Sequence, residues 1–260
     1  DVSTKFKSQR VRLNIENDIN YEDQIKKGLL DILFINKSTS LEYSIKKNSL
    51  DFSTDDKETL KGSMNFKPFY LKLDLNYEGL STKNLFDDES IFMDLIKSEI
   101  IKNENLNVNM GLNVKNITNS NELSNLDLNI GLEQGDIVFS KSKILWRDNV
   151  EIEMNEGLLD YNNDEIFLSG KLTVNADDIG DFYRSFQIKK NDRKQIKKIQ
   201  FDFVYGFNKR KFKFDNVKVD NKSDEKIDQF INNYNSSEKV FLNKITFKNF
   251  INNFFKVYFG

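Results

Sequence analysis

The feature that most constrains the fold of this chain is a strict alternation of apolar and polar residues over many long segments. In LKLDLNYE, residues 71–78, every odd-numbered residue is apolar and every even-numbered residue is charged or an amide. The same pattern recurs in LNVNMGLNV, residues 106–114, and in LDLNIGLE, residues 126–133. Successive side chains of a β-strand point to opposite faces of its sheet. The pattern therefore predicts half-buried strands that each have one apolar and one polar face.

Comparable alternation along the rest of the chain predicts a mainly β fold. It is found within residues 11–15, 41–52, 137–154, 166–174 and 201–219. Strands of this kind would be roughly 25–36 Å long at about 3.3 Å per residue. An apolar sheet face must be covered. We therefore expect a long, twisted, antiparallel sheet that curves or folds over its apolar face, as an open half-pipe or groove. No linker rich in Pro, Gly or Ser is present, so we expect residues 1–260 to form a single domain.

Apolar residues at helical spacing predict about four short amphipathic helices among the strands. Their ranges are residues 87–102, 177–186, 222–233 and 243–258. The last helix has an apolar stripe made of Phe247, Phe250, Ile251, Phe254, Phe255 and Tyr258. This stripe predicts a lid that packs over the end of the sheet; a helix in a membrane interface, or one that docks a partner, is the alternative.

The chain contains no His and no Cys, which excludes several kinds of chemistry. The commonest general base, the thiol nucleophile, disulfides and the usual zinc ligands are all missing. No glycine-rich phosphate loop or nucleophile elbow is found. We therefore expect a protein that is not an enzyme and uses no metal or cofactor. A glycan-acting enzyme is the remaining catalytic alternative, and it would need two carboxylates about 5–10 Å apart in a polar cleft.

Charge and hydropathy limit the choice of partners. The net charge is −2 and both signs are interspersed, so we expect no nucleic-acid partner. The longest apolar run, Leu29–Ile35, is interrupted by Asp31. It is much shorter than the roughly 20 residues that a membrane-spanning helix needs.

Three polar clusters have a structural and a functional interpretation. Asp177, Asp178 and Asp181 could bind a metal, but acidic residues at a helix start are expected to bind free backbone N–H groups. The segment DYNNDE, residues 160–165, partly matches a calcium loop but lacks its glycine, so a hairpin turn is expected. The basic run KKNDRKQIKK, residues 189–198, predicts a solvated connection, with anionic lipid headgroups or nucleic acid as the alternative partners. Its lack of interleaved aromatic residues disfavours nucleic acid.

The apolar strand faces are either an ordinary core or a groove for acyl chains, and the sequence leaves both open. A groove for acyl chains needs a large apolar surface that excludes water but almost no specific polar group. The residues expected to form the groove or core are Leu71, Leu73, Leu75, Leu126, Leu128, Ile130, Leu172, Val174, Phe201 and Phe203.

The C-terminal half resembles the AsmA-like family of bacterial envelope proteins. The resemblance is carried by LNVNMGLNVKNI, LDLNIGLEQGDIVF, IFLSGKLTVNADDIGDFYRSF and the strand pair IQFDFVYGFNKRKFKFDNVKVDN, followed by TFKNFINNFFKVYFG. It covers roughly residues 104–260, whereas residues 1–103 share only general strand character.

The resemblance implies a role in the envelope of Gram-negative bacteria. AsmA-like proteins are held at the inner membrane by an N-terminal helix, project into the periplasm and are related to bridge-like lipid transfer proteins. It implies phospholipid as the ligand, a part in outer-membrane biogenesis and integrity, and no catalytic residues. We therefore expect a periplasmic chain attached to the inner membrane by a segment upstream of Asp1. The alternative is a scaffolding β-domain with a closed core that binds an envelope protein.

Overall fold

The computed structural model describes residues 2–7, 11–20, 25–34, 37–81, 103–162, 165–237 and 244–260, and the fold is mainly β. In chain order the strands are β1 (Val2–Lys7), β2 (Val11–Asn20), β3 (Ile25–Phe34), β4 (Lys37–Lys46), β5 (Ser49–Ser53), β6 (Leu60–Phe66), β7 (Phe69–Leu80), β8 (Asn107–Ile117), β9 (Leu123–Glu133), β10 (Asp136–Phe139), β11 (Ser142–Trp146), β12 (Val150–Asn162), β13 (Glu165–Ala176), β14 (Lys198–Gly206) and β15 (Lys211–Val219). The prediction of a mainly β chain is confirmed.

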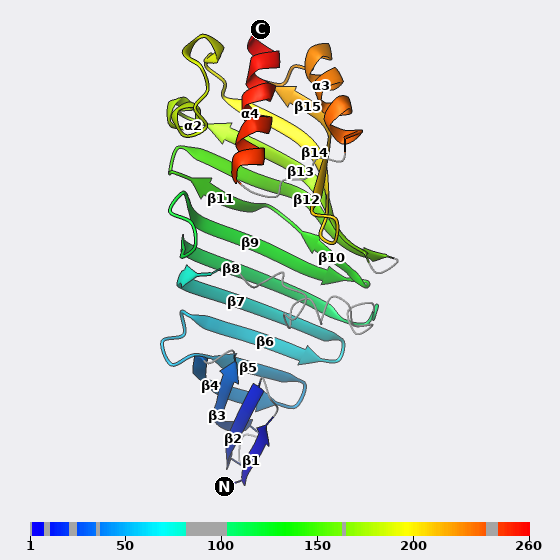
Figure 1. Ribbon diagram of the computed structural model, residues 1–260. Coiled ribbons are helices and arrows are strands. Elements are labelled where there is room, and N and C mark those ends of the chain that lie inside the picture. The colour runs from blue at the N-terminus through cyan, green and yellow to red at the C-terminus, as the bar shows by residue number, and fades with distance from the viewer. Residues whose placement is uncertain are drawn as a thin grey trace.

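The strands form one 15-stranded sheet in which neighbours in sequence are almost always neighbours in space. Strands β10 and β11 lie end to end between β9 and β12. The sheet is elongated and twisted, and the N-terminal and C-terminal ends of the chain lie at its opposite ends (Figure 1). Fourteen successive rows at about 4.8 Å each give a length of roughly 60 Å.

One pair of strands contradicts the predicted antiparallel sheet. Strands β7 and β8 pair in parallel, whereas the other neighbouring pairs are antiparallel. A parallel pair requires a crossover that brings the chain back to the starting end of the first strand. The connection from Leu80 to Asn107 is long enough to do this, whereas a tight hairpin is not. The alternation of side chains carries no information about strand direction, so the sequence could not reveal this pair.

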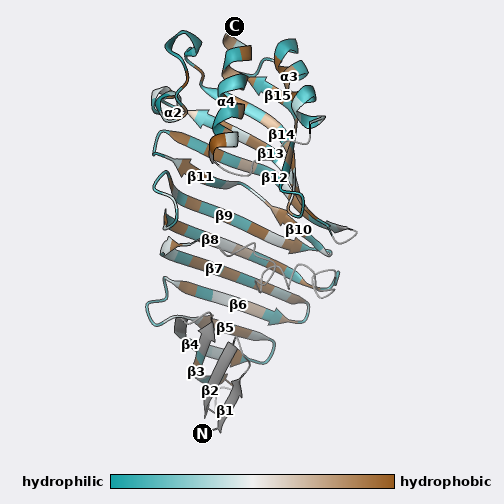
Figure 2. Ribbon diagram, in the orientation of Figure 1, coloured by the Kyte–Doolittle hydropathy of each residue, from teal (hydrophilic) through white to brown (hydrophobic). Residues whose placement is uncertain are grey.

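An unbroken row of apolar residues runs across one face of the sheet, with one residue on each of eleven successive paired strands. Each member lies directly opposite the next on the neighbouring strand: Ile45, Leu50, Met64, Leu71, Val108, Leu132, Ile137, Leu159, Leu168, Tyr205 and Phe212. All of them are half-buried or buried. On β7 and β8 the opposite face carries polar contacts, with the Lys115 ammonium 2.6 Å from the Glu78 carboxylate and the Asn113 amide 3.1 Å from that of Asn76. Figure 2 shows the alternation as bands along β7, β8 and β9.

β-Bulges keep the apolar residues on one face where their spacing in the sequence changes. In β12 the apolar positions are even-numbered up to Met154 and odd-numbered from Leu159. The pairing with β13 shifts between Asn155 and Leu158, and Glu156 has a φ of 55°. The extra residue of a bulge reverses the facing of the residues that follow. Without this bulge, Leu159 would point to the polar face.

The described helices are α2 (Gly180–Ser185), α3 (Glu225–Asn235) and α4 (Lys244–Phe259), with a short 3₁₀ turn, η1 (Lys190–Asp192). They confirm three of the predicted helices; the fourth, at residues 87–102, lies outside the described residues. The Asp224 carboxylate caps α3 by accepting the N–H groups of Lys226 and Ile227.

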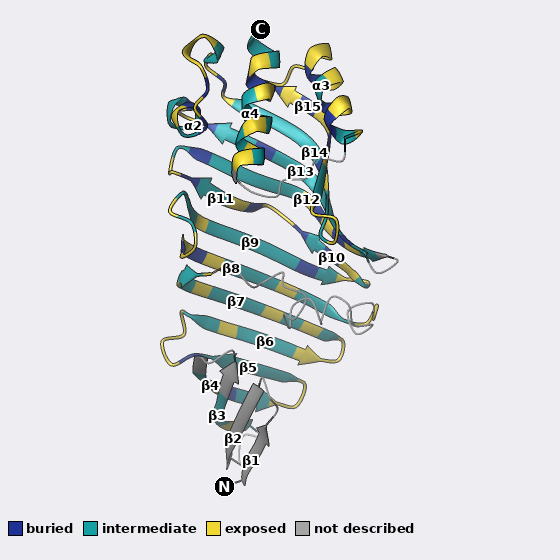
Figure 3. Cartoon of the chain, viewed as in Figure 1, coloured by how far each residue is buried: buried dark blue, intermediate teal, exposed yellow. Residues whose placement is uncertain are grey.

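The helices cover one end of the apolar face and form the main core there. Buried residues from α2, α3, α4 and β11–β15 make a single cluster that includes Trp146, Tyr183, Ile227 and Phe255. A smaller cluster on the same face is centred on Ile137, Phe139, Leu159 and Ile166. Figure 3 shows the exposed positions on the outer sides of α3 and α4. The covered end of the sheet is the place where a ligand site can be built.

Candidate apolar binding site

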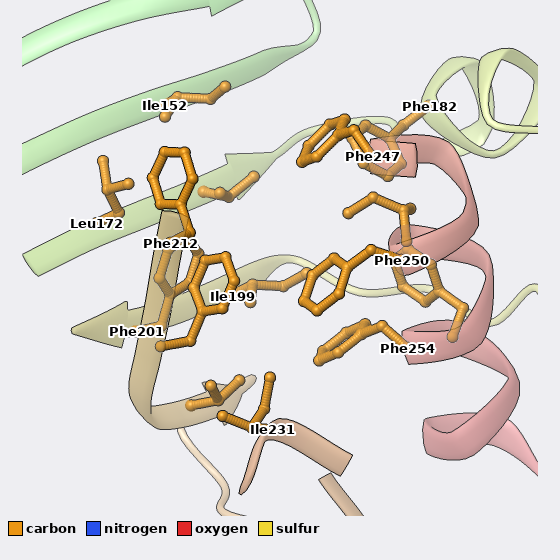
Figure 4. Close-up of a pocket in the computed structure, with 15 residues that line it drawn as sticks. Ile152, Leu172, Phe182, Ile199, Phe201, Phe212, Ile231, Phe247, Phe250 and Phe254 are labelled. Carbon is orange, nitrogen blue, oxygen red and sulfur yellow. The ribbon is translucent and has the colours of Figure 1, made fainter. Parts of the chain in front are cut away.

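A pocket of about 350 Å³ lies between α4 and the apolar face of the sheet, within the range of about 300–1,000 Å³ typical of ligand sites. Figure 4 shows side chains from the sheet and from α4 pointing into this space. Every lining residue in the described part of the chain is apolar: Ile152, Leu172, Val174, Phe182, Ile199, Phe201, Phe212, Phe214, Val217, Ile231, Phe247, Phe250, Ile251, Phe254 and Phe255.

The floor of the pocket is built by cross-strand pairs. Val174 of β13 lies opposite Ile152 of β12 and Ile199 of β14, and Leu172 lies opposite Phe201. These partners share a face because paired residues in a sheet point the same way. The floor is therefore a direct consequence of the alternation in β12, β13 and β14.

The roof is the apolar stripe of α4, held in place by ring contacts. The ring of Phe250 stacks on Phe214 of β15 at 5.2 Å between centroids and meets Tyr234 of α3 edge-on at 4.8 Å. Such pairs contribute about 0.5–1.5 kcal/mol each beyond area burial. The Asn252 side-chain amide also donates to the carbonyl of Phe186 at the end of α2, at 2.7 Å. Contacts to α2, α3 and β15 together fix the position of α4.

The pocket reaches the surface near the start of α4. Phe247 lines the pocket and leaves 38% of its area exposed, and Ile245, just before it, is 68% exposed. Large exposed apolar side chains beside an apolar pocket are typical of an entrance. The apolar row of the sheet also leads here, since its last member, Phe212, lines the pocket.

The electrostatics of the pocket favour an uncharged ligand group. Among the described residues, none of the lining side chains is polar, and the nearby phenols of Tyr183 and Tyr234 are neutral. Burial raises the pKa of Tyr234 to about 12, and burial also raises the pKa of Tyr183. A site without polar groups selects by apolar area and by exclusion of water. The described lining can hold a hydrocarbon segment and contains no acidic or basic side chain.

The structure brings together part of the predicted groove. Leu172, Val174 and Phe201 line the pocket, whereas Phe203 is 5% exposed and belongs to the core. The remaining candidates lie on the same face of the sheet, on β7 and β9, half-buried and outside the pocket: Leu71, Leu73, Leu75, Leu126, Leu128 and Ile130. The helix stripe also lines the pocket, except Tyr258, whose ring lies 4.8 Å from that of Phe259.

The pocket-lining residues that were not predicted from the sequence lie in both the floor and the walls of the pocket. Ile199, Phe212 and Phe214 complete the floor, while Phe182 of α2 and Ile231 of α3 form walls. The strand residues carried a usable signal, because each belongs to an alternating segment next to Phe201 or Leu172. The wall residues carried none, since helical spacing does not tell which strand a helix will cover.

The acidic cluster at α2 serves the backbone and its neighbours. Asp178 accepts the N–H of Gly180 at 2.7 Å, and Asp181 accepts from the amide of Asn149 and forms an ion pair with Arg184. Asp178 therefore has the expected role of binding a backbone N–H at the helix start, whereas Asp181 contacts side chains instead. Strands β12 and β13 pair up to Asn162 and Glu165, which confirms a hairpin in DYNNDE; residues 163–164 lie outside the described part. Among the described residues, no three acidic groups gather to hold a metal ion.

No helix in the described part of the chain is long and apolar enough to cross a membrane. Comparisons with family models, with curated protein sequences and with solved structures found no match. The evidence about function therefore comes from the chain itself.

Proposed function

We propose that this chain shields lipid acyl chains on the apolar face of its sheet, as a non-enzymatic protein of the bacterial envelope. In this role the sheet acts as an open groove, and the pocket under α4 holds the end of an acyl chain. The ligand is a phospholipid, and its movement supports the integrity of the outer membrane. The chain works in the periplasm, attached to the inner membrane by a segment upstream of Asp1.

The observation that carries this proposal is the apolar row that ends in an all-apolar pocket. The row crosses ten strand spacings, or roughly 50 Å at about 4.8 Å each, and a small ligand has no need of such a track. An extended hydrocarbon is the ligand that fits a long dry surface without polar groups. The resemblance of residues 104–260 to AsmA-like proteins supports the envelope location.

The proposal is tested by mass spectrometry of lipid extracted from the purified chain and from two valine variants. Val174 lies on the pocket floor, while Val204 is 40% exposed on the other face of β14. We expect phospholipid at about one molecule per chain in the wild type. Val174→Asp should lower it about tenfold or more, since an unpaired charge in an apolar site costs well over 1.4 kcal/mol. Val204→Asp should leave it unchanged.

A third variant covers the case in which Val174→Asp fails to fold. Val174→Phe stays apolar and fills part of the pocket, at a cost of about 1–3 kcal/mol in stability. With a wild-type circular dichroism spectrum, it should carry less lipid than wild type. Wild-type lipid content in a folded Val174→Phe chain, or no lipid on the wild type, would contradict the proposal.

A second candidate function is a scaffolding domain with a closed core that binds a protein partner. It is favoured by the tight covering of β12–β15, where Ile227 is fully buried and Phe255 is 1% exposed. In that case the wild type would carry no lipid, and Val174→Asp would simply unfold. The lipid measurement therefore separates the two functions.

A further inference from the structure

A second distinctive surface lies at the end of the molecule where α4 finishes. The loop between α2 and β14 contains Lys189, Lys190, Arg193, Lys194 and Lys197, with Asp192 as the one acid among them. The four lysines are exposed, and Arg193 is half-buried. We call these five residues the basic tip. Figure 2 shows the loop that follows α2 as mostly hydrophilic.

The loop is held in a defined shape, so its lysines point outward from a fixed base. Ile188 and Ile196 are 2% and 1% exposed and anchor its two ends in the core. The Tyr183 hydroxyl donates to the carbonyl of Lys194 at 2.6 Å, and the Arg193 guanidinium donates to that of Ile188 at 2.9 Å. A loop fixed in this way keeps its charges together, and binding costs it less conformational entropy than a free tail would lose.

The last turn of α4 adds aromatic side chains to the basic tip. The Lys194 ammonium lies 5.2 Å from the centre of the Phe259 ring, and Tyr258 packs beside Phe259. Both aromatic residues are half-buried. Figure 1 shows the end of α4 and the loop that follows α2 at the same end of the molecule. Lysines next to aromatic rings are typical of surfaces that meet lipid headgroups.

The positive charge of the basic tip is not neutralised by its neighbours. Among the described residues, none of its five cations forms an ion pair with a carboxylate. The nearby acids are Asp192, Asp220 and Asp224. The Asp220 carboxylate accepts the N–H of Lys197 at 2.9 Å, and Asp224 caps α3. The tip is a local positive excess on a chain whose net charge is −2.

We propose that the basic tip docks on the surface of an anionic lipid bilayer. This proposal deepens the proposed function because it names the surface that the chain binds. It rests on the proposed function only for the reason to bind a membrane, since a chain that shields lipid needs contact with one. The chemistry that recognises the bilayer is the attraction of clustered lysines to anionic headgroups, with the aromatic turn of α4 beside them. Nucleic acid fits less well, because the loop has no aromatic residues between its lysines on which bases could stack.

The test measures co-sedimentation of the full chain with vesicles. One set contains phosphatidylcholine with 30% phosphatidylglycerol, and the other contains phosphatidylcholine alone. We expect binding to the anionic set only, weakened by added salt. The triple variant Lys189→Gln, Lys190→Gln, Lys194→Gln should bind about 100-fold more weakly, because each lysine near an anionic membrane contributes about 1 kcal/mol, which is roughly fivefold in affinity.

A matched triple variant controls for net charge. Lys47→Gln, Lys57→Gln, Lys72→Gln removes three exposed lysines from β7 and from the β4–β5 and β5–β6 turns. It should bind like the wild type, and both triples should keep the wild-type circular dichroism spectrum. The proposal is overturned if the wild type ignores anionic vesicles, if the two triples lose binding equally, or if the tip binds single-stranded DNA and not vesicles. Lipid bound in the pocket is measured separately, so vesicle binding can fail while the proposed function stands.

Discussion

At the scale of single residues, Asn235 forms hydrogen bonds with the edge strand of the sheet that a neighbouring strand would otherwise form. Strand β15 is the last in the sheet, so its outer N–H and C=O groups have no neighbouring strand. The Asn235 side chain, at the end of α3, accepts the N–H of Phe214 at 3.1 Å and donates to its carbonyl at 2.7 Å. An amide group offers the donor and acceptor that a neighbouring peptide would offer. This contact closes part of an edge that could otherwise pair with another chain.

We expect Asn235→Ala to destabilise the fold by about 1–3 kcal/mol, because the buried Phe214 loses two hydrogen bonds. Asn233→Ala is the control, since Asn233 lies on the same helix and is exposed. Urea unfolding measures the difference in the free energy of unfolding between the two variants. Equal stabilities would mean that the amide contact with Phe214 contributes nothing.

At the scale of elements, bulges decide which face each strand presents. The shift from even-numbered to odd-numbered apolar positions in β12 also occurs in β15, between Phe214 and Val217, where Asn216 has a φ of 51°. In β9 the apolar positions change in the opposite sense, from odd-numbered Leu123 to even-numbered Leu126. The pairing of β9 with β11 shifts there, and Asn125 has a φ of 49°. Three strands thus use the same device to keep a continuous apolar face.

The bulge in β12 can be tested at Glu156, whose φ of 55° lies in the left-handed region. Asn tolerates this region, while a β-branched residue does not. We expect Glu156→Val to be about 1–2 kcal/mol less stable than Glu156→Asn in urea unfolding. Both variants remove the exposed ion pair with Lys171, so that pair cancels from the comparison. If Val and Asn give the same stability, residue 156 does not hold the bulge in this conformation.

Local pattern explains how much of the fold could be predicted. Alternation at Leu71–Tyr77 reports the face of each side chain directly, so strands and apolar faces were predictable. The change from even-numbered to odd-numbered apolar positions between Met154 and Leu159 was also visible in the sequence. Only the strand pairing shows that this change marks a bulge. The parallel pair β7–β8 was not predictable, because it depends on how the chain crosses over after Leu80. The pocket was predictable only in part: its floor follows from alternation, but its walls, Phe182 and Ile231, depend on where helices dock.

At the scale of the whole molecule, the apolar pocket and the basic tip lie at the same end of one sheet. The uninterrupted row from Ile45 to Phe212 leads into the pocket under α4, and the basic tip lies beyond it at the same end of the sheet. Each part suits one portion of a phospholipid, the apolar parts its acyl chains and the lysines its headgroup. On this proposal, the pocket under α4 accepts one of the acyl chains.

The fluorescence of Trp146, the only tryptophan in the chain, can show whether an acyl chain enters the pocket. Trp146 is 6% exposed, and its ring lies 5.3 Å from that of Phe182, which lines the pocket. Bromine atoms quench tryptophan only at close range. A brominated fatty acid, added below the concentration at which it forms micelles, should therefore quench Trp146, while its unbrominated counterpart should not. Val174→Phe should reduce the quenching. Equal fluorescence with the two fatty acids at saturating concentration would contradict an acyl chain in the pocket.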